Sequence, residues 1–284
     1  MLEQILLIIF IFLFGIVIGS FLNVCILRIP KHETIVTVPS HCMSCGYNLK
    51  WYDNIPLFSY IFLKGKCRKC GAHISVQYPV IEALNGVMYV LIFVRFIFFG
   101  DTANALREAY GTVSFADLII NLSYVEIIRT VIYCLLFSAL LVLTLIDWRT
   151  YEIPVGINIF ILVLGLINLI IVIISGGKWL DYVIGLFAVS VPLLLILLIS
   201  KGRAIGGGDV KLMGAAGLLL GWQHIVLAFV LGCIIGSIIH ITRMKVSGEG
   251  KVLAMGPYLS AGILITIFAG DYIIKGYLTL IGLY

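Results

Sequence analysis

Long apolar stretches alternate with short polar ones along most of this chain. Several approach or reach the roughly 20 apolar residues that cross a bilayer as a helix. The shortest are the sixth and seventh, so the division between those two is the least defined part of the pattern. The sequence therefore predicts an all-α polytopic membrane protein with about eight transmembrane helices, at about 4–26, 79–99, 125–146, 154–175, 180–199, 209–222, 223–242 and 257–280.

Composition supports this reading of the pattern. Of the 284 residues, 62% are hydrophobic and 12% are charged, whereas a soluble domain carries about 25% charged residues. The first apolar stretch has no basic segment before it, since Glu3 is its only charge, and it is longer than the apolar part of a cleaved signal peptide. We expect it to stay as a membrane helix, with the lipid bilayer as a necessary partner.

The basic residues gather in alternate loops. With eight spans, 14 of the 19 Lys and Arg residues lie in or beside the loops at about 28–78, 147–153, 200–209 and 243–256. Short loops rich in Lys and Arg stay in the cytosol. The sequence therefore predicts that these loops are cytosolic and that both termini lie outside.

The largest polar segment, residues 28–78, carries two C-x2-C pairs. Cys42 and Cys45 form the first pair, and Cys67 and Cys70 form the second after a gap of 21 residues. Four thiolates at this spacing are typical of a tetrahedral structural Zn²⁺ site, which leaves no open position for catalysis. Disulfides are the alternative, but the predicted cytosolic location is reducing. We expect a small zinc-ribbon-like domain inserted between the first two helices.

Two acidic residues fall at the ends of expected membrane helices. Asp147 closes the third helix, and Asp209 opens the sixth directly after Gly206, Gly207 and Gly208. Two crossings separate the two acids, which places both at the cytosolic boundary. An N-cap is the simple alternative for Asp209, since Asp is a favoured cap. The shared face favours a site, and three glycines leave backbone that a substrate strand can approach closely.

Paired carboxylates at one membrane face indicate a definite chemistry. Two carboxylates that share a proton cannot both ionise cheaply, so one serves as an acid and the other as a base. Such a pair activates water against a peptide carbonyl. Ion or solute transport is the main alternative, but transporters place their acids near mid-bilayer. A membrane scaffold whose zinc loop docks a partner is a third hypothesis, and it needs neither acid.

The ordered motifs resemble those of the bacterial type IV prepilin peptidases, which are G-x-G-D-type intramembrane aspartic proteases. The chain departs from that pattern at Val155, where the family often has an acid, and at Ala254-Met255, where it often has Pro-Phe. The matching motifs cover most of the chain and are, in order, Gly19-Ser20-Phe21-Leu22-Asn23-Val24, Arg28-Ile29-Pro30, the four-cysteine spacing, Tyr78-Pro79-Val80-Ile81-Glu82, Asp147 with Ile153-Pro154, Gly206-Gly207-Gly208-Asp209-Val210-Lys211-Leu212, and Gly256-Pro257.

This resemblance implies a bifunctional enzyme of the bacterial plasma membrane. Asp147 and Asp209 would cut the basic leader of type IV prepilins or pseudopilins at the cytosolic face. S-adenosylmethionine would then supply a methyl group to the new N-terminus. The resemblance suggests Glu82 and Gly86 as contacts of that cofactor, although a carboxylate near a helix N-terminus is also explained by the helix dipole.

The resemblance also sets the expected domain organisation. Residues 1–27 would form the first membrane helix, 28–78 the cytosolic four-cysteine domain and 79–284 the membrane-embedded peptidase domain. No nucleic-acid partner is expected.

Overall fold

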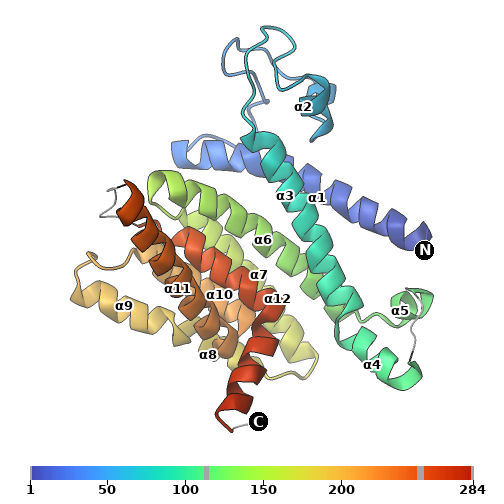
Figure 1. The fold of residues 1–284 in the computed structure, drawn as a ribbon, viewed down its shortest axis with the longest axis vertical. Coiled ribbons are helices and arrows are strands. Elements are labelled where there is room, and N and C mark those ends of the chain that lie inside the picture. The colour runs from blue at the N-terminus through green and yellow to red at the C-terminus, as the bar shows by residue number, and fades with distance from the viewer. Residues whose placement is uncertain (1, 112–114, 248–252, 283–284) are drawn as a thin grey trace. The chain divides into compact units, whose positions relative to one another are not determined.

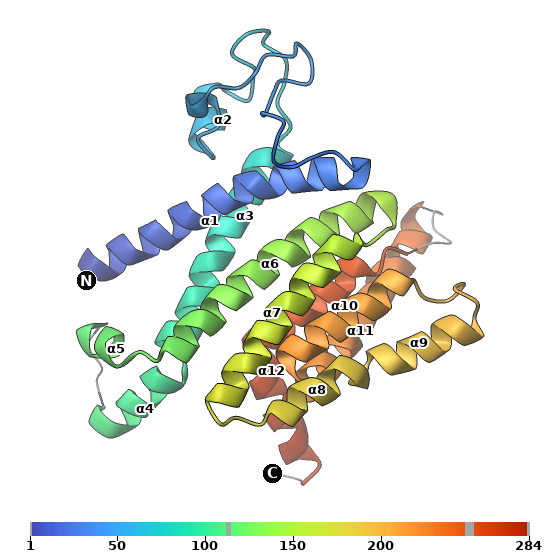
Figure 2. The same cartoon turned by 180° about the vertical axis from the view of Figure 1, so that it is seen from behind.

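The computed structural model describes residues 2–111, 115–247 and 253–282. Within these residues the regular structure is helical, apart from two isolated β-bridges, His41 with Asn48 and Lys66 with His73. The chain forms two compact units, Met1–Ser138 and Ala139–Tyr284, and the boundary falls inside helix α6 (Tyr124–Thr150). Figures 1 and 2 show the helices from opposite sides.

Two long helices that pack closely dominate the first unit. A Cβ atom on Gly15 would lie 2.7 Å from the Cα of Gly86, and one on Gly19 would lie 2.7 Å from the Cα of Glu82. Small residues at this spacing let two membrane helices approach closely. The elements of this unit are α1 (Leu2–Arg28), η1 (Ile29–Lys31), η2 (Trp51–Asp53), α2 (Phe58–Phe62), α3 (Gln77–Phe93), η3 (Val94–Phe98), α4 (Asp101–Tyr110), α5 (Phe115–Asn121) and the first half of α6.

The second unit is a helical bundle that includes the end of α6. Glycines again set its closest contacts: the Cβ that Gly217 lacks would lie 2.1 Å from the carbonyl oxygen of Gly185, so α10 and α8 touch backbone to backbone. The remaining elements are α7 (Val155–Ile174), α8 (Trp179–Ala188), α9 (Ser190–Ile199), α10 (Gly207–Leu220), α11 (Trp222–Ser247) and α12 (Gly256–Leu280).

Seven helices in the described residues are long and apolar enough to cross a membrane, which confirms a multi-pass membrane protein. The expected span at 209–222 corresponds to α10, which has 14 residues. At 1.5 Å per residue it is about 21 Å long, less than the ~30 Å hydrocarbon core. All its residues from Leu212 to Leu220 are buried. The seven are Leu2–Lys31, Gln77–Phe98, Tyr124–Thr150, Val155–Ile174, Trp179–Ile199, Trp222–Lys245 and Gly256–Leu280.

The expected span at 180–199 is interrupted. It consists of α8 and α9, which meet at Val189. Pro192, the third residue of α9, has no N–H to donate to the carbonyl of Ala188, and its ring crowds that carbonyl. The proline therefore accounts for the break.

Candidate active site and metal centre

Four helices of the second unit meet at one end of the bundle. The amide of Gly256, at the start of α12, lies 2.8 Å from the carboxylate of Asp147, near the end of α6. The guanidinium of Arg243, near the end of α11, lies 5.4 Å from the centre of the Trp148 ring. A Cβ on Gly208, at the start of α10, would lie 2.8 Å from the Cβ of Ile153 in the α6–α7 loop. Both aspartates therefore lie at this end.

Asp147 is buried in the last turns of α6, with 4% of its surface exposed. Its Oδ2 accepts the Gly256 N–H at 2.8 Å. A Cβ on Gly256 would lie 2.8 Å from that same oxygen, so the contact depends on a glycine. Gly256 thus lies at the site, whereas the sequence showed it only as part of the Gly256-Pro257 motif.

Asp209 lies at the third position of α10, and Gly206 is the N-cap residue of that helix. The Asp209 carboxylate accepts a hydrogen bond from the backbone N–H of Gly206, and Asp147 acts on Asp209 electrostatically. A side chain that reaches back from the third helical position to the N-cap amide is one half of a capping box. Asp209 therefore stabilises the start of its own helix. It also lies within electrostatic range of Asp147.

The three glycines before Asp209 have different surroundings. Gly206 has an ordinary extended conformation with φ −76°, so unusual backbone angles do not explain it. A Cβ there would lie 3.1 Å from Asp209 Oδ2, and one on Gly208 would lie 2.8 Å from Ile153. A Cβ on Gly207 would meet only Leu197, at an ordinary 3.7 Å. Crowding, and not backbone freedom, explains two of the three glycines.

Asn158 of α7 supports this helix start and was missed in the sequence. Its Nδ2 donates to the carbonyl of Gly208 at 3.3 Å. The side chain is buried, and its Oδ1 has no hydrogen-bond partner among the described residues. The only signal in the sequence is an amide inside a mostly apolar span, five residues after Ile153.

The first unit holds the cysteine cluster. The Sγ atoms of Cys42, Cys45, Cys67 and Cys70 all lie within 4.8 Å of one another, and those of Cys42 and Cys70 are 3.9 Å apart. Zn–S bonds of about 2.3 Å in a tetrahedron separate the sulfurs by about 3.8 Å. The four residues that the sequence predicted as ligands therefore come together and fit a zinc ion.

Tight turns shape each C-x2-C pair. Gly46 and Gly71 follow the second cysteine of their pairs with φ of 67° and 71°, a left-handed conformation that glycine adopts without strain. Each donates its N–H, at 2.9 Å, to the carbonyl of the first cysteine of its pair. These turns bring both sulfurs of a pair to the same side.

The thiols differ in acidity. Amide N–H groups of Ser44 and Cys45 lower the pKa of the Cys42 thiol to about 6. At Cys70 the Ala72 amide lowers the pKa, but the Cys45 thiol and desolvation outweigh it and raise the pKa to about 11. Loss of a proton from one thiol thus makes loss of a proton from a neighbouring thiol less favourable. A dication would hold all four as thiolates, because metal binding releases their protons.

A buried carboxylate joins the two cysteine pairs without a metal. Asp53 accepts Arg68 Nε at 2.7 Å on one oxygen and the Tyr47 hydroxyl at 3.2 Å on the other. Tyr47 follows the first pair, and Arg68 lies inside the second. Desolvation opposes the charge of Asp53, but the hydrogen bonds from Arg68, the Lys50 amide and Tyr47 outweigh it and lower the pKa of Asp53.

Glu82 and Gly86 both lie on α3 at its contact with other parts of the first unit. Glu82 Oε2 accepts the backbone N–H of Leu57 at 2.8 Å. A Cβ on Gly86 would lie 2.6 Å from the Ile16 side chain and 2.9 Å from that of Phe12. The structure thus gives Glu82 an anchoring contact and Gly86 a packing contact. Their suggested contact with S-adenosylmethionine stays a prediction.

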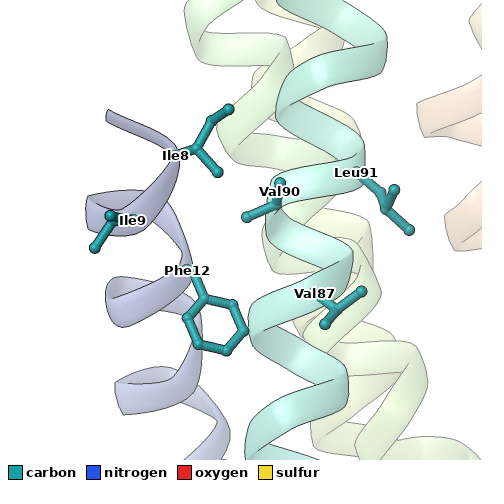
Figure 3. Close-up of a pocket in the computed structure, with 6 residues that line it drawn as sticks. All are labelled: Ile8, Ile9, Phe12, Val87, Val90 and Leu91. Carbon is teal, nitrogen blue, oxygen red and sulfur yellow. The ribbon is translucent and has the colours of Figure 1, made fainter. Parts of the chain in front are cut away.

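An apolar groove runs between α1 and α3 (Figure 3). It encloses about 290 Å³ and contains none of the residues that the sequence singled out. Because it offers no polar group, it lacks the means to bind a charged cofactor. Its lining residues are Ile8, Ile9, Phe12, Val87, Val90 and Leu91.

Comparison with known proteins places these features in a family. Residues 13–96 match the model of the bacterial peptidase A24 N-terminal domain, and residues 134–241 match that of the type IV leader peptidase family. The prepilin leader peptidase/N-methyltransferase of Pectobacterium carotovorum subsp. carotovorum is 31% identical, over 87% of this chain and 88% of that protein. The protein of the same name from Bacillus subtilis strain 168 is 29% identical, over 94% and 96%. No solved structure matches this chain significantly.

Proposed function

Because the chain belongs to the type IV leader peptidase family, we propose that it is a prepilin leader peptidase and N-methyltransferase, with Asp147 and Asp209 as its catalytic pair. The observation that carries this proposal is that the two carboxylates lie at one end of the second unit, within electrostatic range of each other. Each comes from a different helix, and each accepts the N–H of a glycine, Gly256 or Gly206.

The chemistry follows from the pairing. One carboxylate takes a proton from a water molecule, which attacks the scissile carbonyl carbon, while the other, protonated, donates a hydrogen bond to the carbonyl oxygen. The protonation of such a pair belongs to both groups jointly. Glycine amides hold the two side chains in place, and Asn158 holds the carbonyl of Gly208 beside Asp209. Fixed donors of this kind need no reorganisation during the reaction.

We further propose the setting of this reaction. The basic loops face the cytosol of a bacterium, so the aspartates lie at the inner face of the plasma membrane and both termini lie outside. The substrates are type IV prepilins or pseudopilins, whose basic leader meets that face. Residues 1–27, 28–78 and 79–284 form the first helix, the four-cysteine domain and the peptidase domain.

The cysteine domain is proposed to hold a structural Zn²⁺ through Cys42, Cys45, Cys67 and Cys70. All four positions of the tetrahedron come from the protein, so the ion stabilises the segment and takes no part in cleavage. S-adenosylmethionine, when bound, supplies the methyl group for the second activity. Glu82 and Gly86 are buried and engaged in contacts within the first unit.

Replacement of either aspartate tests the proposal. Asp147→Asn or Asp209→Asn should lower cleavage of a prepilin in membranes by about 10³-fold or more, as loss of one member of a catalytic pair does. Asp181→Asn, in the first turn of α8, is the matched control and should cleave normally. Cleavage at the normal rate by either site variant would overturn the assignment, and peptide-independent ion flux in sealed vesicles would favour a transporter.

A further inference from the structure

The short helix α2 exposes an apolar face outside the membrane-spanning helices. Phe58, Ile61 and Phe62 are 48%, 67% and 80% exposed. They stand at positions i, i+3 and i+4, which form one face of a helix. The opposite face contacts the rest of the segment, since Ser59 is buried and its hydroxyl donates a hydrogen bond to the carbonyl of Tyr52 at 2.9 Å. Water is a poor solvent for three such side chains on one turn.

The structure ties this helix to the end of a membrane helix. Leu57, the N-cap residue of α2, donates its N–H to Glu82, the sixth residue of α3. Five residues of helical rise are about 8 Å, so α2 begins near the level at which α3 starts its span. Figures 1 and 2 both show α2 close to that end of α3. Leu57 has a φ of 60°, a strained conformation that tertiary contacts must hold in place.

The charges around α2 are positive. Lys64 and Lys66 follow it directly and are exposed, and Lys50 is exposed nearby in the sequence. The neighbouring acids do not offset them at the surface, since Asp53 is buried against Arg68 and Glu82 is buried against Leu57. Aromatic and aliphatic groups edged by lysines are typical of segments that lie at the headgroup level of anionic bilayers.

We propose that Phe58, Ile61 and Phe62 insert at headgroup level in an anionic phospholipid bilayer, with Lys64 and Lys66 on the phosphates. The cysteine-bearing segment is joined to α1 at one end and to α3 at the other. This contact would add a third attachment to the membrane, at α2. A prepilin leader is a poorer occupant, because the leader assigned by the proposed function is itself basic. The inference rests on the membrane helices and not on the aspartates, so its failure would leave the proposed function intact.

Photo-crosslinking tests the contact directly. The full-length protein with p-benzoylphenylalanine in place of Phe62 is reconstituted into bilayers of phosphatidylglycerol and phosphatidylcholine, irradiated and analysed by mass spectrometry. The matched control carries the probe at Val36, which is 84% exposed in the same segment. We expect lipid adducts at position 62 at least about fivefold above those at position 36. Equal yields at both positions, or adducts to an added prepilin in place of lipid, would overturn the proposal.

The role of the lysines has its own measurement. Replacing phosphatidylglycerol by phosphatidylcholine should lower the adduct yield at position 62 by several-fold, because the lysines then lose their anionic partners. Lys64→Gln with Lys66→Gln should give the same loss in the original bilayers, with zinc content unchanged as a check of folding. A yield that is indifferent to lipid charge would contradict the lysine–phosphate contact even if the double variant fails to fold.

Discussion

The cysteine cluster and the aspartate pair gather reactive groups in opposite ways. The four sulfurs come from residues 42–70 of one segment, and two local turns set their positions. The two carboxylates are 62 residues apart in sequence, and three further elements have to pack correctly before they meet. A metal site of this kind is encoded locally, whereas a carboxylate pair is encoded by the packing of a whole unit.

The two regions also offset their negative charge differently. A bound dication would offset two of the four thiolate charges. The carboxylates receive neutral N–H groups from Gly256 and Gly206, which leave their charge unneutralised, as the proposed proton transfer requires. The comparison predicts that the first region depends on an ion and that the second depends on glycine geometry.

Removal of zinc should have the largest effect and should be confined to the first region. The apparent free energy of zinc binding in such sites is about 10–16 kcal/mol, more than a short segment can replace by packing. We expect about one zinc per purified chain, and rapid proteolysis within residues 29–76 after chelation or in Cys42→Ser with Cys45→Ser. If the metal-free protein resists protease as well as the untreated protein does, the zinc assignment is wrong.

Gly256→Ala should have a larger effect on cleavage than a change of either Gly207 or Gly208. Its methyl group would lie 2.8 Å from Asp147 Oδ2, so the carboxylate or the start of α12 has to move. We expect a loss of about 10²-fold in kcat for prepilin cleavage, since a misplacement of about 1 Å has that cost. Gly276→Ala in the same helix is the control, because its Cβ meets nothing within 4 Å. Comparable activity of both variants would contradict the geometry.

Substitutions of the glycines before Asp209 should differ in their effect on prepilin cleavage. Gly208→Ala places a methyl group 2.8 Å from Ile153, whereas Gly207→Ala makes only an ordinary contact with Leu197. Overpacking costs about 1–3 kcal/mol, so we expect Gly208→Ala to lose at least about tenfold in kcat and Gly207→Ala to lose much less. The two variants are compared in one cleavage assay with equal amounts of membrane protein. The reverse order would show that backbone freedom matters more than crowding.

Asn158→Leu should have the smallest effect. It removes one hydrogen bond to the Gly208 carbonyl, worth about 1 kcal/mol, and should lower kcat by roughly fivefold with KM little changed. Asn168→Leu is the control, since Asn168 lies on the same helix, is also buried and donates to the carbonyl of Leu219 at 3.0 Å. Both should lower thermal stability, but only the first should affect kcat. Equal losses of kcat in the two variants would show that Asn158 contributes only to packing.

The difference between the two regions also explains what the sequence could predict. The cysteine cluster follows from spacing alone, and counting the crossings between the two aspartates was enough to predict that both lie at the same end of the bundle. Gly256 stood out only as part of a motif and Asn158 not at all, because their contacts with Asp147 and Gly208 form through space between residues far apart in the sequence. The short length of α10 was visible in the sequence as the 14-residue stretch 209–222, but its burial was not, because Leu212–Leu220 is as apolar as a lipid-facing span. Whether those residues face protein or lipid depends on tertiary packing.

The backbone contact between Gly217 of α10 and Gly185 of α8 has a consequence for substrate entry. Two helices in such contact have no intervening side chains to rearrange. We therefore expect α10, which carries Asp209, to stay fixed against α8. Under the proposed function, any movement that admits a peptide is therefore expected at the α6–α7 loop or the start of α12, and not between α10 and α8.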